Sequence, residues 1–330
     1  MIRRVVLWTI GSLAILAAVI GCAAWWMADL DEAMPAHPVT LVVAAGASVA
    51  DIGRQLAGAG VIRSAAAFDA LVRLRGGGRD IQAAEYTFAP HSSLRTVVGV
   101  LDAGGTPSTI WITIPEGFTA EQIGAALQAR GIGTQAEFEA VVRTTDLRFD
   151  TSYSRGLEGY LFPDTYQLRR DATPRDAAFT MTAQFMRELP RDYRQAARRL
   201  GLTVPQIVTA ASLVEREAKA ASERPIMAGV YYNRLRRGMP LQVDATIEYA
   251  LPHHKAALSF GDLKLDSPYN TYMYPGLPPT PIANPGRASL TAAFHPAVTD
   301  YLYYVYKGNG HHQFSRTLDE QQAAERRFLR

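Results

Sequence analysis

Two carboxylates stand close together at the end of an apolar segment, in the run Val214-Glu-Arg-Glu217. Residues 204–218 place apolar side chains at helical spacing, with Pro205 in the first turn, where its missing N–H costs no hydrogen bond. When this helix is projected at about 100° per residue, Glu215 lies roughly 55° from the centre of the apolar face and Glu217 lies about 105° away. The pattern therefore predicts that Glu215 leans toward the protein interior.

A carboxyl group on an apolar helix face is costly to ionise, so it can keep a proton near neutral pH and act as a general acid. The alternative is structural, with Glu215 at the edge of the apolar face and paired with an arginine such as Arg234 or Arg236. Spacing alone favours the ion pair, because ion pairs with a purely structural role also perturb the pKa values of carboxyl groups. The following residues, up to Leu241, predict a turn and a second helix that ends at Arg237-Gly238.

Two loops carry polar and aromatic side chains that are candidates for a binding site. The first, residues 156–166, has too many Gly and Pro residues for a regular helix and contains Glu158 and Asp164. The second, residues 267–286, is long and proline-rich, and a coil of this length is usually functional. Its tyrosine and asparagine side chains suit a sugar ligand, because rings stack on pyranose faces and amides bind hydroxyls. Its candidates are Tyr269, Asn270 and Tyr272.

Residues 241–251 come directly after the second predicted helix. Gln242, Asp244 and Thr246 are expected on one side of an extended start to this segment. Asp244 is equally suited to cap the N-terminus of a helix, and both roles stay open.

A strand–helix–helix pattern occurs twice before these segments. The first copy has a strand at 39–43 and two helices capped by Ser48 and Ser64. It is followed by a strand at 84–88 and by a helix that ends at Gly104-Gly105. A shift of about 71 residues, with one deletion, aligns the start of a second copy. The aligned pairs are Val43–Ile114, Gly46–Gly117, Ile52–Ile123, Leu56–Leu127, Gly60–Gly131, Val61–Ile132 and Phe68–Phe138. Chance similarity between strand–glycine–helix segments is the alternative.

The composition limits the class of protein. With 330 residues, of which 48% are hydrophobic, the chain can bury a large core, and its formal charge of +3 gives no argument for nucleic acid. Cys22 is the single cysteine, so neither disulfides nor thiol chemistry is expected outside the apolar segment that contains it. The histidine pairs 253–254 and 311–312 are adjacent and lack a carboxylate set with zinc-like spacing. We predict no metal and no other cofactor.

Residues Val5–Met27 carry no charged side chain and are long enough to cross a bilayer. Arginines precede this segment and acidic residues follow it, which places the N-terminus in the cytoplasm and the rest outside the cytoplasmic membrane. A cleaved signal peptide is an alternative, although the apolar run is long and continues into Trp25 and Trp26. A lipoprotein site at Cys22 is a poorer match.

Seven blocks of residues in the same order resemble one family, the membrane-anchored endolytic murein transglycosylases, or MltG/YceG-like group. The blocks are LEGYLFPDTY (157–166), ASLVEREA with SERP (211–225), YNRLRRGMPLQVDATIEYAL (232–251), SPYNTY (267–272), GLPPTPIANPG (276–286), HP (295–296) and YLYYV (301–305). The resemblance covers nearly all of the chain after the apolar segment. Ala245 in place of a frequent proline, and the lack of a histidine after Glu320, are departures from the family pattern.

The resemblance implies that Glu215 is the catalytic residue and that the bond cut is the β-1,4 bond between N-acetylmuramic acid and N-acetylglucosamine within nascent glycan strands. The product would carry a 1,6-anhydro end. Hydrolysis of such a bond needs two carboxylates, whereas here the C6 hydroxyl of the muramic acid attacks, and Glu215 is expected to act alone. Glu158 and Asp164 are the candidates for a second carboxylate if the enzyme is a hydrolase. Further substrate-binding candidates are Glu158, Asn233, Gln242, Asp244, Thr246, Tyr269, Asn270 and Tyr272.

The predicted fold class is α+β: a transmembrane helix, a LysM-like small α/β module and a mixed α+β catalytic domain. The expected boundaries are 1–29 for the cytoplasmic tip and anchor, 37–105 for the LysM-like module, 106–145 for the second strand–helix–helix unit and 146–330 for the catalytic domain. The expected partners are peptidoglycan glycan strands, the membrane through Val5–Met27, and peptidoglycan synthases. Two other functions stay open: a non-catalytic wall-binding scaffold and a two-carboxylate muramidase.

Overall fold

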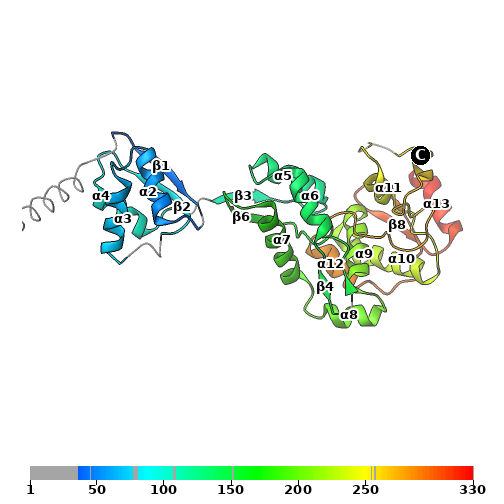
Figure 1. The fold of residues 1–330 in the computed structure, drawn as a ribbon. Coiled ribbons are helices and arrows are strands. Elements are labelled where there is room, and N and C mark those ends of the chain that lie inside the picture. Colours follow the sequence, from blue (N-terminus) through cyan, green and yellow to red (C-terminus); the bar gives the residue numbers. More distant parts are fainter. Residues whose placement is uncertain are drawn as a thin grey trace, which may run out of the picture. The chain divides into compact units, whose positions relative to one another are not determined.

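A computed structural model describes residues 36–44, 46–76, 81–106, 109–150, 152–253, 255 and 258–329. The chain divides into two compact units, the first ending at Thr109 and the second beginning at Ile110 (Figure 1). The predicted transmembrane segment, Val5–Met27, lies outside the described residues. Within the described residues, none of the helices has both the length and the apolar character needed to cross a membrane.

The first unit packs three helices against a two-stranded sheet. Its elements are β1 (Val39–Val43), α2 (Val49–Gly58), α3 (Ala65–Leu74), β2 (Ala84–Phe88) and α4 (Leu94–Ala103). The strands are antiparallel, with Val39 opposite Phe88. The side chains of Ser48 and Ser64 accept hydrogen bonds from backbone N–H groups in the first turns of α2 and α3, so the two predicted caps are confirmed.

The second unit begins with elements in the same order. Helix α5 (Ala120–Ala129) has the bounds of α2 shifted by 71 residues, and α6 (Gln135–Thr144) has those of α3 shifted by 70, which agrees with the predicted alignment and its one deletion. Strand β3 (Thr109–Thr113) pairs with β6 (Thr165–Arg169), and α7 (Pro174–Glu188) follows. The expected boundary after residue 145 therefore cuts between two paired strands, and residues 110–330 form one unit.

The remaining elements complete the second unit. They are β4 (Arg148–Phe149), β5 (Ser152–Tyr153), α8 (Tyr193–Leu200), α9 (Val204–Glu217), α10 (Arg224–Arg236), α11 (Asp244–Ala250), α12 (Arg287–Phe294), β7 (Tyr303–Tyr306), β8 (His312–Ser315) and α13 (Leu318–Phe328), with short 3₁₀ turns at Ala221–Glu223 and Asp262–Lys264. The described residues thus form an α+β fold in which each sheet has two strands. Residues 267–286 hold no regular element, as predicted.

Helix α9 organises the second unit. It packs against α8, α10, α11 and α12 (Figure 1). Thr203 caps it through a hydrogen bond from the Gln206 N–H, and the side chain of Gln206 accepts one from the Thr203 N–H in return. Ile207, Leu213 and Val214 are fully buried. The helix ends at Glu217, so Glu215 lies in its last turn, as predicted.

Helix α11 corrects one expectation. It begins at Asp244, and the residue in the N-cap position is Val243. The Asp244 side chain makes no capping hydrogen bond, because it accepts one from the Tyr272 hydroxyl instead. Thr246 lies inside the helix and is fully buried, so it does not share an extended face with Gln242.

Candidate active site

Glu215 is held between two groups that favour a negative charge. Its side chain is 6% exposed, and its Oε2 accepts a hydrogen bond of 3.0 Å from the Gly286 N–H. A guanidinium nitrogen of Arg224, on α10, lies 3.7 Å from Oε1. Arg224 is itself fixed, because its Nε donates a 3.0 Å hydrogen bond to the hydroxyl of Ser289. The burial confirms the predicted orientation of Glu215.

The arginines expected under the ion-pair interpretation are occupied elsewhere. Arg234 donates to the carbonyl oxygens of Leu302 and Leu241, and Arg236 donates to the side chain of Asn233. The ion-pair interpretation therefore named the wrong partners. The cation beside Glu215 instead comes from Arg224, in the first turn of α10, which spacing on α9 could not indicate.

A second carboxyl group, that of Glu116, accompanies Glu215, and the sequence argument missed it. Glu116 precedes α5 and lies against Gly286, where a side-chain carbon built on the glycine would be only 1.9 Å from Oε1 of Glu116. Burial raises the pKa of Glu116, the negative charge of Glu215 raises it further, and Arg224 acts in the opposite direction. The two carboxyl groups therefore share one electrostatic environment.

The loop at 282–286 is fixed by hydrogen bonds to two other segments of the second unit, residues 117–118 and 158–161. Its Asn284 accepts hydrogen bonds through Oδ1 from the N–H groups of Gly159 and Leu161, and donates through Nδ2 to Phe118 O and Glu158 Oε1. The backbone carbonyl of Asn284 also accepts from the Gly117 N–H, and its N–H donates to the Phe118 carbonyl. One buried amide thus fixes the Gly286 N–H that binds Glu215.

Glu158 is a buried acid at the N-terminus of α5. Both of its oxygens accept from the Ala120 N–H, at 3.1 and 3.0 Å, and the Tyr249 hydroxyl donates to Oε2 at 3.3 Å. Burial raises the pKa of Glu158 to about 7, and these hydrogen bonds limit the rise. The other proposed second carboxylate, Asp164, accepts from Gln184 on α7.

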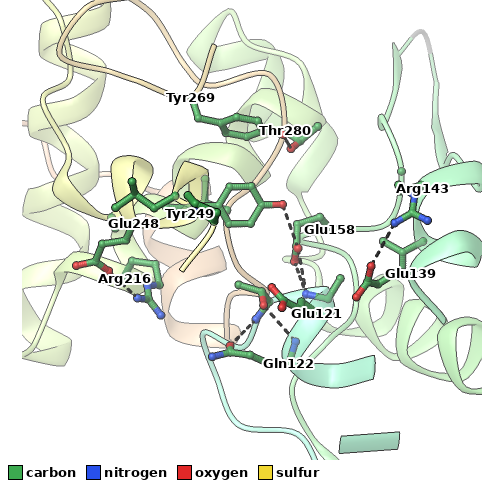
Figure 2. A pocket seen from close by; sticks show the side chains of 18 of the residues that line it. Glu121, Gln122, Glu139, Arg143, Glu158, Arg216, Glu248, Tyr249, Tyr269 and Thr280 are labelled. Carbon is green, nitrogen blue, oxygen red and sulfur yellow. Dashed lines mark hydrogen bonds and ion pairs between the residues drawn. The ribbon is translucent and has the colours of Figure 1, made fainter. Parts of the chain in front are cut away.

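Glu158 also lines a pocket of about 980 Å³ in the second unit. Figure 2 shows Tyr249 and Tyr269 on one wall and the pairs Arg216–Glu248 and Arg143–Glu139 at its sides. Glu215 is not among its lining residues. The loop at 282–286 connects the two places, because Asn284 binds Glu158 and Gly286 binds Glu215.

Glu217 is more enclosed than the helical projection indicates. The Tyr304 hydroxyl donates to its Oε2 at 3.3 Å. Burial, followed by the charge of Asp244, raises the pKa of Glu217 to about 7. The projection counts only positions on α9, whereas the start of α11 and strand β7 cover this side chain from outside the helix. Both acids at the end of α9 are thus enclosed.

Several other candidate residues hold loops in place. Asn233 donates to the carbonyls of Thr299 and Tyr301, and fully buried Asn270 donates to those of Leu263 and Leu265. Their amide donors are thereby occupied.

The remaining candidates differ in exposure. Thr246 is fully buried and bonds to Val243 O, whereas Gln242 is exposed, with φ +52°, and accepts from Arg234. The Tyr269 hydroxyl contacts Thr280 at 2.6 Å beside the pocket.

The described residues contain no cluster of three or more His, Cys, Asp or Glu side chains suited to a metal ion. Of the histidine pairs considered in the sequence, His311 and His312 bind the Glu223 carboxylate through Nδ1 at 3.0 and 2.8 Å. His253 lines the pocket, and His254 lies outside the described residues.

Comparison with known proteins gives one family. The pattern of the YceG-like family matches residues 41–327. An endolytic murein transglycosylase of Bacillus subtilis is 34% identical over 307 residues, which is 88% of this chain and 85% of that protein. The enzyme of the same name from Streptococcus pneumoniae D39 is 30% identical over 298 residues, 81% of this chain but 54% of the pneumococcal protein. A crystal structure of a YceG-like protein from Listeria monocytogenes aligns with a TM-score of 0.58 at 29% identity, and the alignment covers 87% of this chain and 98% of the other.

Proposed function

The chain belongs to the YceG-like family, and we propose on that basis that it is an endolytic murein transglycosylase, with Glu215 as the catalytic residue. The observation that carries the proposal is the enclosed carboxyl of Glu215 at the end of α9, inside the region that matches the family. An acid in such a place can exchange a proton with a bound substrate while water is kept away.

We propose that the bond cut joins C1 of N-acetylmuramic acid to O4 of N-acetylglucosamine. Glu215 gives its proton to the departing O4 as the C1–O4 bond breaks. The C6 hydroxyl of the same muramic acid then bonds to C1, and the Glu215 carboxylate takes the hydroxyl proton. Glu215 is thereby regenerated, the sugar ends in a 1,6-anhydro ring, and no water is consumed. Such acid–base catalysis supplies about 10²–10⁴-fold in rate, and the intramolecular hydroxyl adds proximity.

We propose that the glycan binds to groups that line the pocket. Glu158 and Tyr269 line it, and the ring of Tyr249 lies 5.0 Å from that of Tyr269 between centroids, which gives an aromatic surface for a sugar. We propose Gln242, Asp244 and Tyr272 as further contacts. Asn233, Thr246 and Asn270 support these loops from within.

We further propose that the chain works at the outer face of the cytoplasmic membrane, anchored by Val5–Met27. The support is the apolar character of that segment and the charges beside it. A tether at this position would keep the enzyme near newly made glycan and near peptidoglycan synthases. Glycan binding by the LysM-like module at 37–105 is proposed from the likeness of its fold alone.

The presence of Glu116 favours one second candidate, a muramidase that uses two carboxylates. In that reaction a second carboxylate attacks C1 or activates water, and the product has a reducing end. The nature of the released end distinguishes the two functions.

The test is to incubate the purified full chain with peptidoglycan and to identify the released ends by mass spectrometry. Anhydro ends that disappear in Glu215→Gln are expected. Reducing ends would support the muramidase, and no release from wild-type protein would support a scaffold. Asp319→Asn, which removes an exposed acid from the first turn of α13, is the matched control. Full activity in Glu215→Gln would show that the assignment of Glu215 is wrong.

A further inference from the structure

Two charged side chains of the pocket are left available to a ligand. Arg155 and Glu121 line the same pocket of about 980 Å³ as Glu158. The other arginines of its lining form ion pairs of 3.1 and 3.3 Å with glutamates, Arg216–Glu248 and Arg143–Glu139. Within the part of the chain that the structure describes, neither Arg155 nor Glu121 has a hydrogen-bond or ion-pair partner, and the two do not pair with each other. The pocket therefore offers one cation and one anion.

The backbone that carries Arg155 is fixed on both sides. Ser154 is 2% exposed. Gly156 has φ +79°, and its N–H donates to Oδ1 of Asp146 at 2.8 Å. A side-chain carbon built on Gly156 would lie 2.8 Å from the Val142 carbonyl oxygen, so the turn requires glycine for its conformation and for space. The exposed Arg155 side chain thus extends from a rigid turn at the pocket.

Glu121 is also held at a fixed place, in the first turn of α5. Thr119 and Gln122 cap this turn reciprocally, and Glu158 accepts from the Ala120 N–H. Figure 2 shows Glu121 and Gln122 on this turn. A negative charge at the start of a helix is favourable to the helix itself, so a test of Glu121 must separate that effect from ligand binding.

The pocket begins close to the proposed catalytic residue. Arg216, the residue after Glu215, belongs to the lining. A side-chain carbon built on Gly117 would lie 3.7 Å from Cγ of Glu215, and Ala120, three residues further along, lines the pocket. Three residues span at most about 11 Å. A substituent of that length on a sugar at Glu215 would therefore reach the pocket wall.

We propose that the pocket binds the peptide stem of the muramic acid that is cleaved, with Arg155 on a stem carboxylate and Glu121 on the free amino group of the stem's diamino acid. This inference rests on the proposed function and names the part of the substrate that these two residues take. The sugar chain itself supplies no cation, because its amino groups are acetylated, whereas the stem carries both charges. The stem starts at O3 of the muramic acid, and three extended peptide residues cover about 10 Å. The rings of Tyr249 and Tyr269 stay available to the sugar.

The test compares anhydro-end release by the full chain from two forms of uncross-linked peptidoglycan. One form keeps its stems, and an amidase has removed them from the other, which leaves only the lactyl carboxylate beside the ring. We expect wild-type kcat/KM to be higher on the stem-bearing form. In Arg155→Gln, kcat/KM on that form falls by about tenfold or more, the usual effect of losing a charge-assisted hydrogen bond, and stays within about twofold on the stripped form. Arg155→Lys keeps the charge and recovers part of the loss.

Arg170→Gln is the matched control for Arg155→Gln. Arg170 is likewise exposed and without a partner among the described residues, but it does not line the pocket. This variant is expected to keep the wild-type preference for stems.

Glu121 is tested by acetylating the free amino groups of the stems. Acetylation removes the positive charge, so it lowers the wild-type rate severalfold and leaves the rate of Glu121→Gln unchanged. Asp319→Asn, which removes an acid from the first turn of α13, responds to acetylation as wild type does. A charge that serves only the helix would give no such difference between the two variants.

Equal wild-type kcat/KM on the two forms, or a loss in Arg155→Gln that is the same on both, would overturn the proposal. An effect of acetylation that is as large in Glu121→Gln as in wild type would remove Glu121 from it. Failure of the proposed function looks different, because wild-type protein would then release no anhydro ends from either form, or Glu215→Gln would keep its activity.

Discussion

Replacing Glu158 with glutamine is expected to make the second unit more stable above neutral pH and to leave it unchanged near pH 4.5. The carboxyl is 8% exposed, and burial raises its pKa from 4.5 to about 7. Glutamine has the same shape and mimics the protonated form. Its carbonyl oxygen, in the place of Oε1, can still accept from Ala120 and Asn284, and its amide, in the place of Oε2, can donate to the Tyr249 oxygen, so only the second contact with the Ala120 N–H is lost.

The sign and size follow from linkage between protonation and folding. The pKa of Glu158 is higher in the folded state, so the folded chain binds the proton more tightly than the unfolded chain. The stability from this group is complete below about pH 4.5 and is lost as pH rises to about 7. A rise from 4.5 to about 7 corresponds to roughly 3 kcal/mol. The Glu158→Gln variant should lack this loss and exceed wild type by about that amount at pH 8.

The assay is urea unfolding of wild type and variant at pH 5, 6, 7 and 8, followed by near-ultraviolet circular dichroism. All the tyrosines except Tyr86 follow residue 150, so this signal reports largely on the second unit. Glu217 and the other acids contribute equally to both proteins and cancel in the difference. Equal pH dependence of the unfolding free energy in the two proteins would refute the reasoning.

Three further outcomes concern the site and its supporting loop. Glu215→Gln should lower anhydro-end release by about 10²–10⁴-fold with little change in melting temperature, because the amide keeps the Gly286 hydrogen bond but cannot supply the proton. Arg224→Gln should lower anhydro-end release severalfold, since it removes the cation 3.7 Å from Glu215 and the hydrogen bond that Arg224 donates to Ser289; an unchanged rate would contradict this. Asn284→Ala should lower unfolding stability by roughly 3–5 kcal/mol in thermal or urea unfolding, because it removes the side-chain oxygen that accepts from the buried N–H groups of residues 159 and 161 and one of the donors to the Glu158 carboxyl. A loss below about 1 kcal/mol would mean that water replaces the amide.

Local signals in the sequence were sufficient for most helices. The predicted cap residues Ser48 and Ser64 are confirmed, and the helix predicted within residues 204–218 is α9, Val204–Glu217. Their capping and periodicity involve residues within a few positions of each other, so the sequence contains the whole cause. The short pairs β4–β5 and β7–β8 were missed in part, because a strand of two to four residues is too short to show a clear alternation of apolar and polar side chains.

The site was harder to predict from the sequence, because elements from other parts of the chain complete it. The helical projection found Glu215 because its apolar neighbours lie on the same helix. It could not find Arg224, and it underestimated the burial of Glu217, because α10, α11 and β7 cover the end of α9 from outside. Contacts such as that of Glu116 with Gly286 join loops 170 residues apart, and no spacing rule connects them.

One signal for Glu116 was nevertheless present in the repeat. At the shift of 71 residues, Gly46 aligns with Gly117, and both glycines have positive φ, +78° and +77°. The residue before the glycine is alanine in the first copy and Glu116 in the second. Where a turn is kept by its glycine, the residue beside it is free to change chemically without cost to the turn. The difference between the two copies falls where the second copy meets Glu215, so comparing aligned turns for newly introduced charges would have selected Glu116 from the sequence.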